Sequence, residues 1–275
     1  MDRSWLSAAL AVLLPLAGVA GEPGYLRLKR VEIVDRHGFE KPMPAFSVLI
    51  PTDWKFDGEV RYAQRVGNPE DLARLAFRAT SPDGRLAVEM FPGWSWTWAD
   101  DPMMRQAMQS QNAMTAQMGG ARAEVGPPMS ARDFLTRVAV PRLRPGAKVL
   151  GIEPIPDLDQ PLQAQVKQAQ TMAAQAGVQM RLKADQARAR IQLTSGKGPA
   201  EEWITAVVYV RTTAMPSMNP ATGQMAQSAM YQSSAESLFG LRAPPGELPT
   251  HEKLFHAVVS TARVDPVWQA RVTQV

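Results

Sequence analysis

The strongest local constraint on the fold is the turn Ser81-Pro82-Asp83-Gly84, which lies between two alternating apolar segments. Proline at the second turn position fixes φ near about −65°, and glycine accepts the positive φ that a reversing chain needs. Apolar residues recur at every second position on both sides, at Leu75, Phe77 and Ala79 and at Leu86, Val88 and Met90. A period of two is typical of a strand with one buried face. The segment therefore predicts an antiparallel hairpin.

Further strands and helices are indicated along the chain. Apolar segments bounded by turn residues predict strands at residues 25–34, 45–51, 54–60, 148–155, 180–193 and 203–210, with weaker strands near Met230 and Phe239. Capping residues and helical apolar spacing predict helices at residues 102–118, 131–140, 162–176 and 251–262. This pattern indicates the α+β class, with helices packed on an antiparallel β-sheet.

Three details of this prediction concern single positions. Thr250 is expected to cap the last helix, and Pro141 is expected to end the second one. Between residues 180 and 193 the apolar side chains move from even to odd positions, which predicts a turn or bulge at Asp185-Gln186.

Residues 1–20 have the pattern of a signal peptide. Arg3 precedes an apolar run of about fifteen residues, and Gly18-Val19-Ala20 offers a small-residue cleavage site. A membrane-spanning helix needs about 20 apolar residues. We therefore expect cleavage after Ala20 and a periplasmic or secreted protein; an uncleaved anchor or a buried N-terminal helix is the alternative.

The mature chain is expected to be soluble and to lack a transmembrane segment, because no later apolar run is long enough. No long linker rich in proline, glycine or serine divides it. Residues 21–275 are therefore expected to form a single α+β domain, with a division into two lobes near residue 156 left open.

Composition excludes several functional classes. Lys and Arg number 30 against 26 Asp and Glu, so the net charge of +4 is too small for the dense basic surface of a nucleic-acid-binding protein. The absence of Cys excludes thiolate catalysis, disulfides and cysteine zinc sites, and only three His are present. We expect no cofactor.

Two segments carry a resemblance to a known family. The run Phe46-Ser47-Val48-Leu49-Ile50-Pro51-Thr52-Asp53-Trp54 resembles the opening strand of PsbP-like proteins. The run Ser260-Thr261-Ala262-Arg263-Val264-Asp265-Pro266-Val267-Trp268 is similar to the closing helix of exported bacterial proteins of that kind. The resemblance implies an α/β/α sandwich built on an antiparallel sheet, and a protein that binds or scaffolds.

Histidine and methionine offer the candidate metal ligands. His251 and His256 are five positions apart, so on a helix they diverge by about 140° and cannot share a tetrahedral zinc. Met-rich segments suit Cu(I), but helical spacing favours packing of the pairs Met104/Met108 and Met114/Met118. The sequence therefore predicts no metal site.

No catalytic residue is assigned. The carboxylate pairs Asp100/Asp101, Asp157/Asp159 and Glu201/Glu202 each lie on one segment, which favours capping or solvation over the opposed carboxylates of a glycosidase. Arg181, Lys183, Arg188 and Arg190 could form a basic face for an anionic glycan or lipid, but a solvated sheet face is the favoured interpretation because Asp185 interrupts it and the net charge is small.

Trp94, Trp96 and Trp98 form the candidate ligand-binding site. In an extended segment the three rings project from one side, where they suit stacking on sugars or packing against a partner; a core role is the alternative. We expect a non-catalytic binding or accessory protein of the cell envelope, with a glycan, peptide or protein ligand. The alternative is an envelope hydrolase that uses this strip as a glycan subsite.

Overall fold

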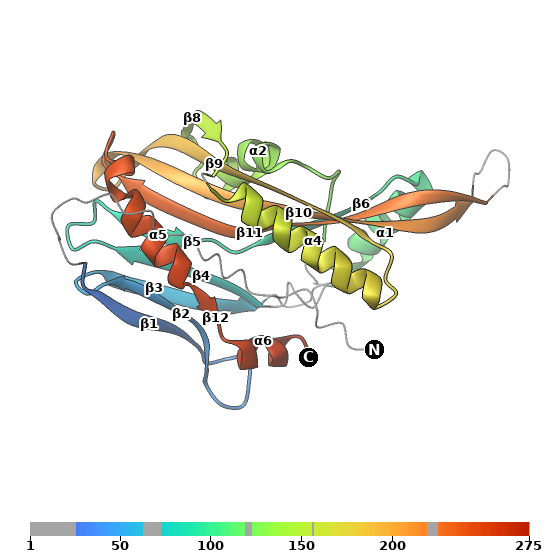
Figure 1. The fold of residues 1–275 in the computed structure, drawn as a ribbon, viewed down its shortest axis with the longest axis horizontal. Coiled ribbons are helices and arrows are strands. Elements are labelled where there is room, and N and C mark those ends of the chain that lie inside the picture. The colour runs from blue at the N-terminus through green and yellow to red at the C-terminus, as the bar shows by residue number, and fades with distance from the viewer. Residues whose placement is uncertain (1–25, 63–72, 119–122, 156, 219–224, 275) are drawn as a thin grey trace.

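The computed structural model describes residues 26–62, 73–118, 123–155, 157–218 and 225–274. The expected signal peptide and the proposed division at residue 156 lie outside these residues. Two antiparallel sheets carry the packed helices, so the α+β class is confirmed (Figure 1). No described helix has both the length and the apolar character needed to cross a bilayer.

The larger sheet holds most of the described strands. In spatial order they are β3 (Lys55–Tyr62), β4 (Ala73–Thr80), β5 (Ala87–Met90), β11 (Met225–Ala243), β10 (Gly198–Met218), β9 (Arg181–Ser195) and β8 (Lys148–Glu153). Strand β6 (Trp94–Ala99) pairs with β11 beyond β5, and β7 (Glu124–Val125) pairs with β6. The smaller sheet consists of β1 (Leu28–Asp35), β2 (Met43–Pro51) and β12 (Arg263–Val264).

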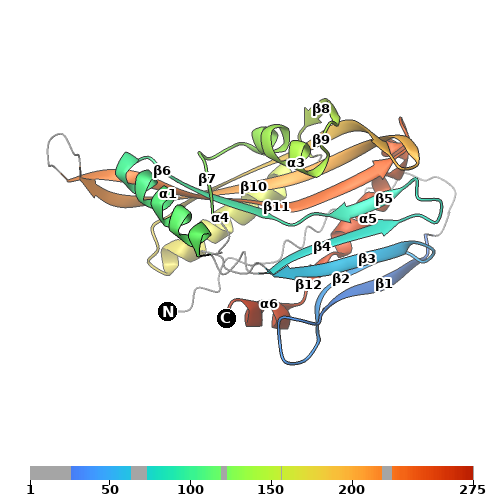
Figure 2. The ribbon, with the colours of Figure 1, turned by 180° about the vertical axis from the view of Figure 1, so that it is seen from behind.

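Helices cover both faces of the larger sheet. Helices α4 (Asp159–Gln175) and α5 (Glu252–Thr261) lie on one face (Figure 1), and the segment from α2 (Ala131–Phe134) through a π-helical turn (Leu135–Ala139) to α3 (Val140–Leu143) lies on the other (Figure 2). The remaining helical elements are α1 (Pro102–Gln117), the 3-10 turn η4 (Leu248–His251) and α6 (Pro266–Val272). The expected helix 102–118 and the expected helix 162–176 are thus confirmed.

The predicted hairpin is present. Strands β4 and β5 are antiparallel, with Thr80 opposite Ala87. Gly84 has φ 74° and donates its N–H to the carbonyl of Ser81 over 2.9 Å. Proline and glycine therefore have the turn positions that their backbone preferences indicate.

The expected break at Asp185-Gln186 is wrong. Strand β9 pairs with β10 without a register shift from Arg181 to Ser195. The apolar phase changes because different helices cover its two faces along its length: Ala184 packs beneath α4, whereas Ala189 and Ile191 pack beneath α2. The shift of apolar residues from even to odd positions therefore reflects a change of covering helix and not a bulge.

Two expected helix boundaries are also wrong. The second helix continues past Pro141 to Leu143, because a π-helical turn widens the helix just before the proline and accommodates its missing N–H. Thr250 lies inside η4, and α5 begins after His251 without a side-chain cap. The segment Ser260–Trp268, expected as one closing helix, spans the end of α5, strand β12 and the start of α6.

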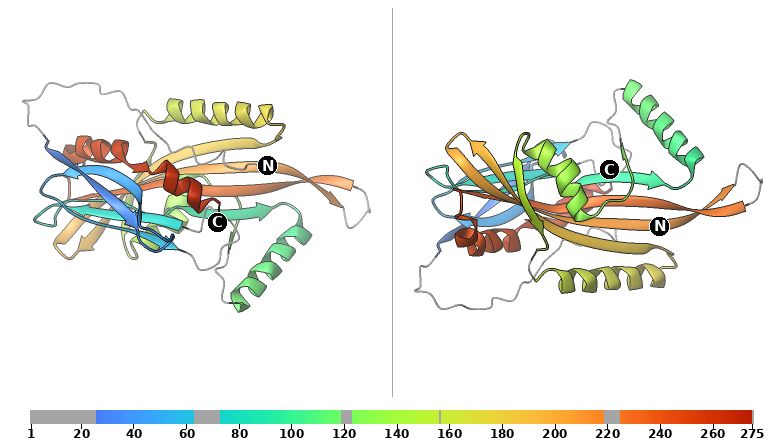
Figure 3. Two further views of the ribbon diagram at one scale, coloured as in Figure 1. Left: turned by 90° about the horizontal axis from the view of Figure 1, so that it is seen from below. Right: turned by 90° about the horizontal axis from the view of Figure 1, so that it is seen from above.

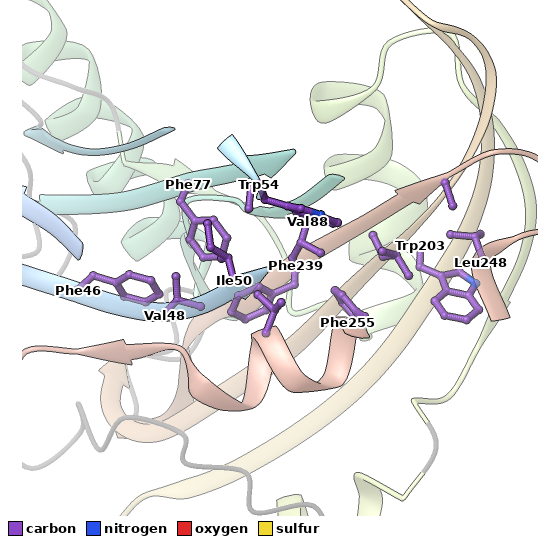
Figure 4. Close-up of a cluster of buried hydrophobic side chains, with 14 of the residues drawn as sticks. Phe46, Val48, Ile50, Trp54, Phe77, Val88, Trp203, Phe239, Leu248 and Phe255 are labelled. Carbon is purple, nitrogen blue, oxygen red and sulfur yellow. The ribbon is translucent and has the colours of Figure 1, made fainter. Parts of the chain in front are cut away.

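The main apolar core lies between the smaller sheet, the larger sheet and α5 (Figure 4). The ring of Phe77 on β4 has centroid distances of 5.6 Å to Phe46 on β2 and 6.4 Å to Phe239 on β11. Each fully buried side chain of this size contributes about 1.5–3 kcal/mol by leaving water. A second cluster packs α2 and α3 on the opposite face, so the larger sheet is buried on both sides.

Candidate functional site

Strands β10 and β11 continue beyond the rest of the sheet as a two-stranded arm (Figure 1). The pairing of β9 with β10 ends at Thr212, and the pairing of β6 with β11 ends at Met230. Within the described part of the chain, residues 213–218 and 225–229 therefore form strand pairs only with each other. We call this portion the arm. The Ala229 carbonyl at its root accepts the Asp100 N–H over 2.9 Å, and strand edges beyond this point have main-chain groups that a partner strand can pair with.

A groove of about 1160 Å³ lies at the root of the arm. Three chain segments form it: the start of α1, the end of α4 with the connection to β9, and the arm itself. The groove is lined by Asp100, Asp101, Pro102, Met103, Gln170, Ala174, Gly177, Val178, Gln179, Met180, Arg181, Thr212, Ala214, Ser217, Gln227, Ser228 and Ala229. Its volume is slightly larger than the range of about 300–1,000 Å³ that is typical of ligand sites.

Most of the polar lining is uncharged. Met103 and Val178 are more than half exposed, which places apolar surface in the groove beside amide and hydroxyl groups. The Asp101 carboxylate accepts the N–H groups of Met103 and Met104 as the cap of α1, and the Asp100 carboxylate accepts the Tyr231 hydroxyl over 3.0 Å. Ser228 Oγ is buried, and no described residue is its hydrogen-bond partner. The groove thus combines apolar contact area with neutral polar side chains.

The three tryptophans of β6 do not form one exposed surface. Trp96 is 4% exposed, stacks on Phe134 with a centroid distance of 5.6 Å and donates its Nε1–H to the Pro127 carbonyl over 3.1 Å. Trp94 meets the same phenylalanine edge-on at 5.8 Å. Trp96 therefore belongs to the core beneath α2.

Trp94 and Trp98 are half-buried, and each has an arginine over its ring. The Arg142 guanidinium lies 5.9 Å from the Trp94 centroid, and the Arg105 guanidinium lies 4.7 Å from the Trp98 centroid. These cation-π contacts occupy ring faces that a sugar would need for stacking. Ligand binding by the tryptophan strip stays a prediction, limited to the exposed edges of Trp94 and Trp98.

The carboxylate pairs have structural partners. Glu202 accepts two hydrogen bonds from Arg144, and Glu201 accepts two from Arg190. These acids lie on opposite faces of β10, as adjacent strand residues must. Asp159 lies in the first turn of α4, and Asp157 has φ 59° in the connection before it.

The expected basic face is divided. Arg188 pairs with Glu153 and Glu252 and lies 3.9 Å over the Trp203 ring. Because Arg181 and Lys183 occupy odd positions of one unbroken strand and Arg188 and Arg190 even positions, the two pairs lie on opposite faces of β9. The four side chains do not form one cationic surface.

Histidine and methionine were the candidate metal ligands. His251 Nε2 lies 3.7 Å from Glu247, and His256 Nε2 lies 3.7 Å from Glu252, so each histidine contacts a different glutamate. No group of three or more histidine or acidic side chains that could hold a metal occurs among the described residues. The packing expected for Met114 and Met118 is wrong: both are exposed, because α1 contributes no buried residue.

Sequence reasoning missed the groove. Ser228 and Ala174 carry no motif, and they come together only because β10 and β11 extend past their neighbours. Comparison with family models, curated proteins and solved structures finds no match for this chain. The resemblance to PsbP-like proteins therefore stays a prediction.

Proposed function

We propose that the chain is an exported binding or accessory protein that holds an extended, largely uncharged polypeptide segment in the groove at the root of the arm. The observation that carries this proposal is the groove itself, in which neutral polar groups and apolar side chains adjoin unpaired strand edges. A peptide in strand conformation gains main-chain hydrogen bonds from such an edge and side-chain contacts from the groove.

The lining favours a peptide over a glycan. The residues that line the groove include no aromatic side chain on which a sugar ring stacks. Exposed amide groups such as those of Gln179 and Gln227 match the donors and acceptors of a peptide backbone. The rival hydrolase has less support, because Glu201 and Glu202 are bound by arginines on opposite faces of one strand.

Blocking the groove tests the proposal. A pool of random dodecapeptides is passed over the immobilised mature protein, and retained peptides are identified by mass spectrometry. The variant Ala174→Trp fills the groove from an exposed position of α4, and Ala164→Trp makes the same change at an exposed α4 position outside it. We expect Ala164→Trp to retain a set of uncharged peptides that Ala174→Trp loses at least tenfold. Equal retention by both variants would contradict the proposal.

A further inference from the structure

A row of charged side chains crosses the larger sheet on the face covered by α3. Glu202 on β10 is fully buried, and both of its oxygens accept hydrogen bonds from Arg144, at 2.7 Å and 2.8 Å. A second contact of 3.0 Å joins Arg144 to Oε2 of Glu89 on β5. The remaining oxygen of Glu89 lies 3.4 Å from Nε of Arg78 on β4, without the geometry of a hydrogen bond. Both carboxylates are therefore engaged.

Arg242 on β11 is the arginine that this arrangement leaves without an ion-pair contact of its own, so that Glu89 and Glu202 attract it only from a distance. It lies directly opposite Glu202 in the sheet, where an arginine and a glutamate normally pair. Arg144 occupies that glutamate, and the neighbour of Arg242 on the other side is Ala87. The side chain is about nine-tenths buried, and no described residue forms a hydrogen bond or an ion pair with it.

A buried charge that is only partly compensated is costly. Moving a charged group from water into a protein interior costs roughly several kcal/mol if no counterion contacts it. Burial, and next the positive charge of Arg78, lower the pKa of Arg242, and the negative charges of Glu89 and Glu202 do not outweigh them. Among the charged groups of this row, three arginines face two glutamates, so one positive charge is in excess. The row would be more stable with one added anion.

We propose that Arg242 and Arg78 form a binding site for one oxyanion, a carboxylate or phosphate group of a small molecule or of a larger ligand. The Arg78 side chain is 47% exposed, so the site is open to solvent from β4. Two guanidinium groups offer the forked donors that carboxylate and phosphate prefer. The site lies in the body of the sheet, apart from the groove, and does not depend on peptide binding.

The test measures anion binding to the mature protein at constant ionic strength. Inorganic phosphate and acetate are titrated separately in a buffer without other oxyanions, with melting temperature and heat of binding as readouts. We expect saturable binding of at least one of them, weakened at least tenfold in Arg242→Gln and several-fold in Arg78→Gln. Tighter binding of phosphate would identify a phosphoryl ligand, and tighter binding of acetate a carboxylate ligand.

Arg61→Gln on β3 is the matched control, because its side chain is 65% exposed and lies outside the row. It should bind the anion as the original protein does. Should Arg242→Gln fail to fold, the Nε–Hε resonances of Arg242 and Arg78 in the unsubstituted protein replace it, and these should shift on titration. Absence of saturable binding, binding unaffected by Arg242→Gln, or unshifted resonances would each overturn the proposal.

Discussion

Glu202→Gln removes the charge that holds Arg144 against the larger sheet. The glutamate is fully buried, and the charge and hydrogen bonds of Glu202 raise the pKa of Arg144 despite the opposing effect of burial. Glutamine keeps the size and one acceptor but places an N–H₂ group against a guanidinium donor. Each hydrogen bond to a charged group contributes about 1.5–3 kcal/mol, and breaking a buried ion pair costs about 3–5 kcal/mol. We expect a loss of about 3 kcal/mol of unfolding free energy because one hydrogen bond survives and Glu89 still contacts Arg144.

Urea unfolding followed by tryptophan fluorescence measures this loss, and the melting temperature should fall by about 6–12 °C for a domain of this size. Glu201→Gln is the control on the opposite face of the same strand. Its partner Arg190 is 46% exposed, so the expected loss is only about 1 kcal/mol. Equal losses for the two single glutamate variants would refute this reasoning.

The remaining predictions concern the core, the acid range and the backbone. Trp96→Ala should lower the unfolding free energy by about 3–5 kcal/mol, and Trp98→Ala by clearly less, in the same urea assay. Burial raises the pKa of Asp35, but hydrogen bonds from Tyr62, Trp268 and two backbone N–H groups outweigh it and lower the pKa overall. The stability that Asp35 contributes is therefore present above about pH 4 and is lost as the pH falls below it. The unfolding free energy of Asp35→Asn should differ most from that of the original protein near neutral pH and least near about pH 2. Urea unfolding across that pH range measures the difference. Ser237→Gly should stabilise the protein by about 0.5 kcal/mol in thermal unfolding, because Ser237 has φ 51°.

Local signals in the sequence were sufficient for much of the fold. The turn at Ser81–Gly84 and the cap at Asp101 depend on backbone preferences and neighbouring residues alone, and both occur where the sequence indicates. The central position of β10 also follows from its own residues, since the apolar stretch 203–208 is buried on both faces.

Features set by distant segments were not predictable in this way. The change of phase in β9 depends on where α2 and α4 cover the sheet, which no local pattern contains. The three-residue spacing of Ser130 and Asp133 identifies a helix start, but nothing nearby shows that a π turn carries the helix past Pro141.

The candidate site shows the same limit. Alternation placed Trp94 and Trp96 on one side of β6, but their exposure depends on Phe134 of α2. Figure 3 shows α1 and α4 on opposite sides of the arm, an arrangement that creates the groove and that follows from strand lengths and helix positions together. Nothing in the sequence near Arg242 indicates that Glu202, the residue opposite it in the sheet, pairs with Arg144.

Backbone hydrogen exchange tests the central claim, peptide binding at the root of the arm, most directly. The protein is exchanged in deuterated buffer with and without the most strongly retained dodecapeptide, and protection is resolved by peptide mass spectrometry. The proposal predicts slower exchange at residues 213–218 of β10 and at the connection 177–181, with no change on β6. Unchanged exchange in the arm, or protection confined to Trp94–Ala99, would contradict it.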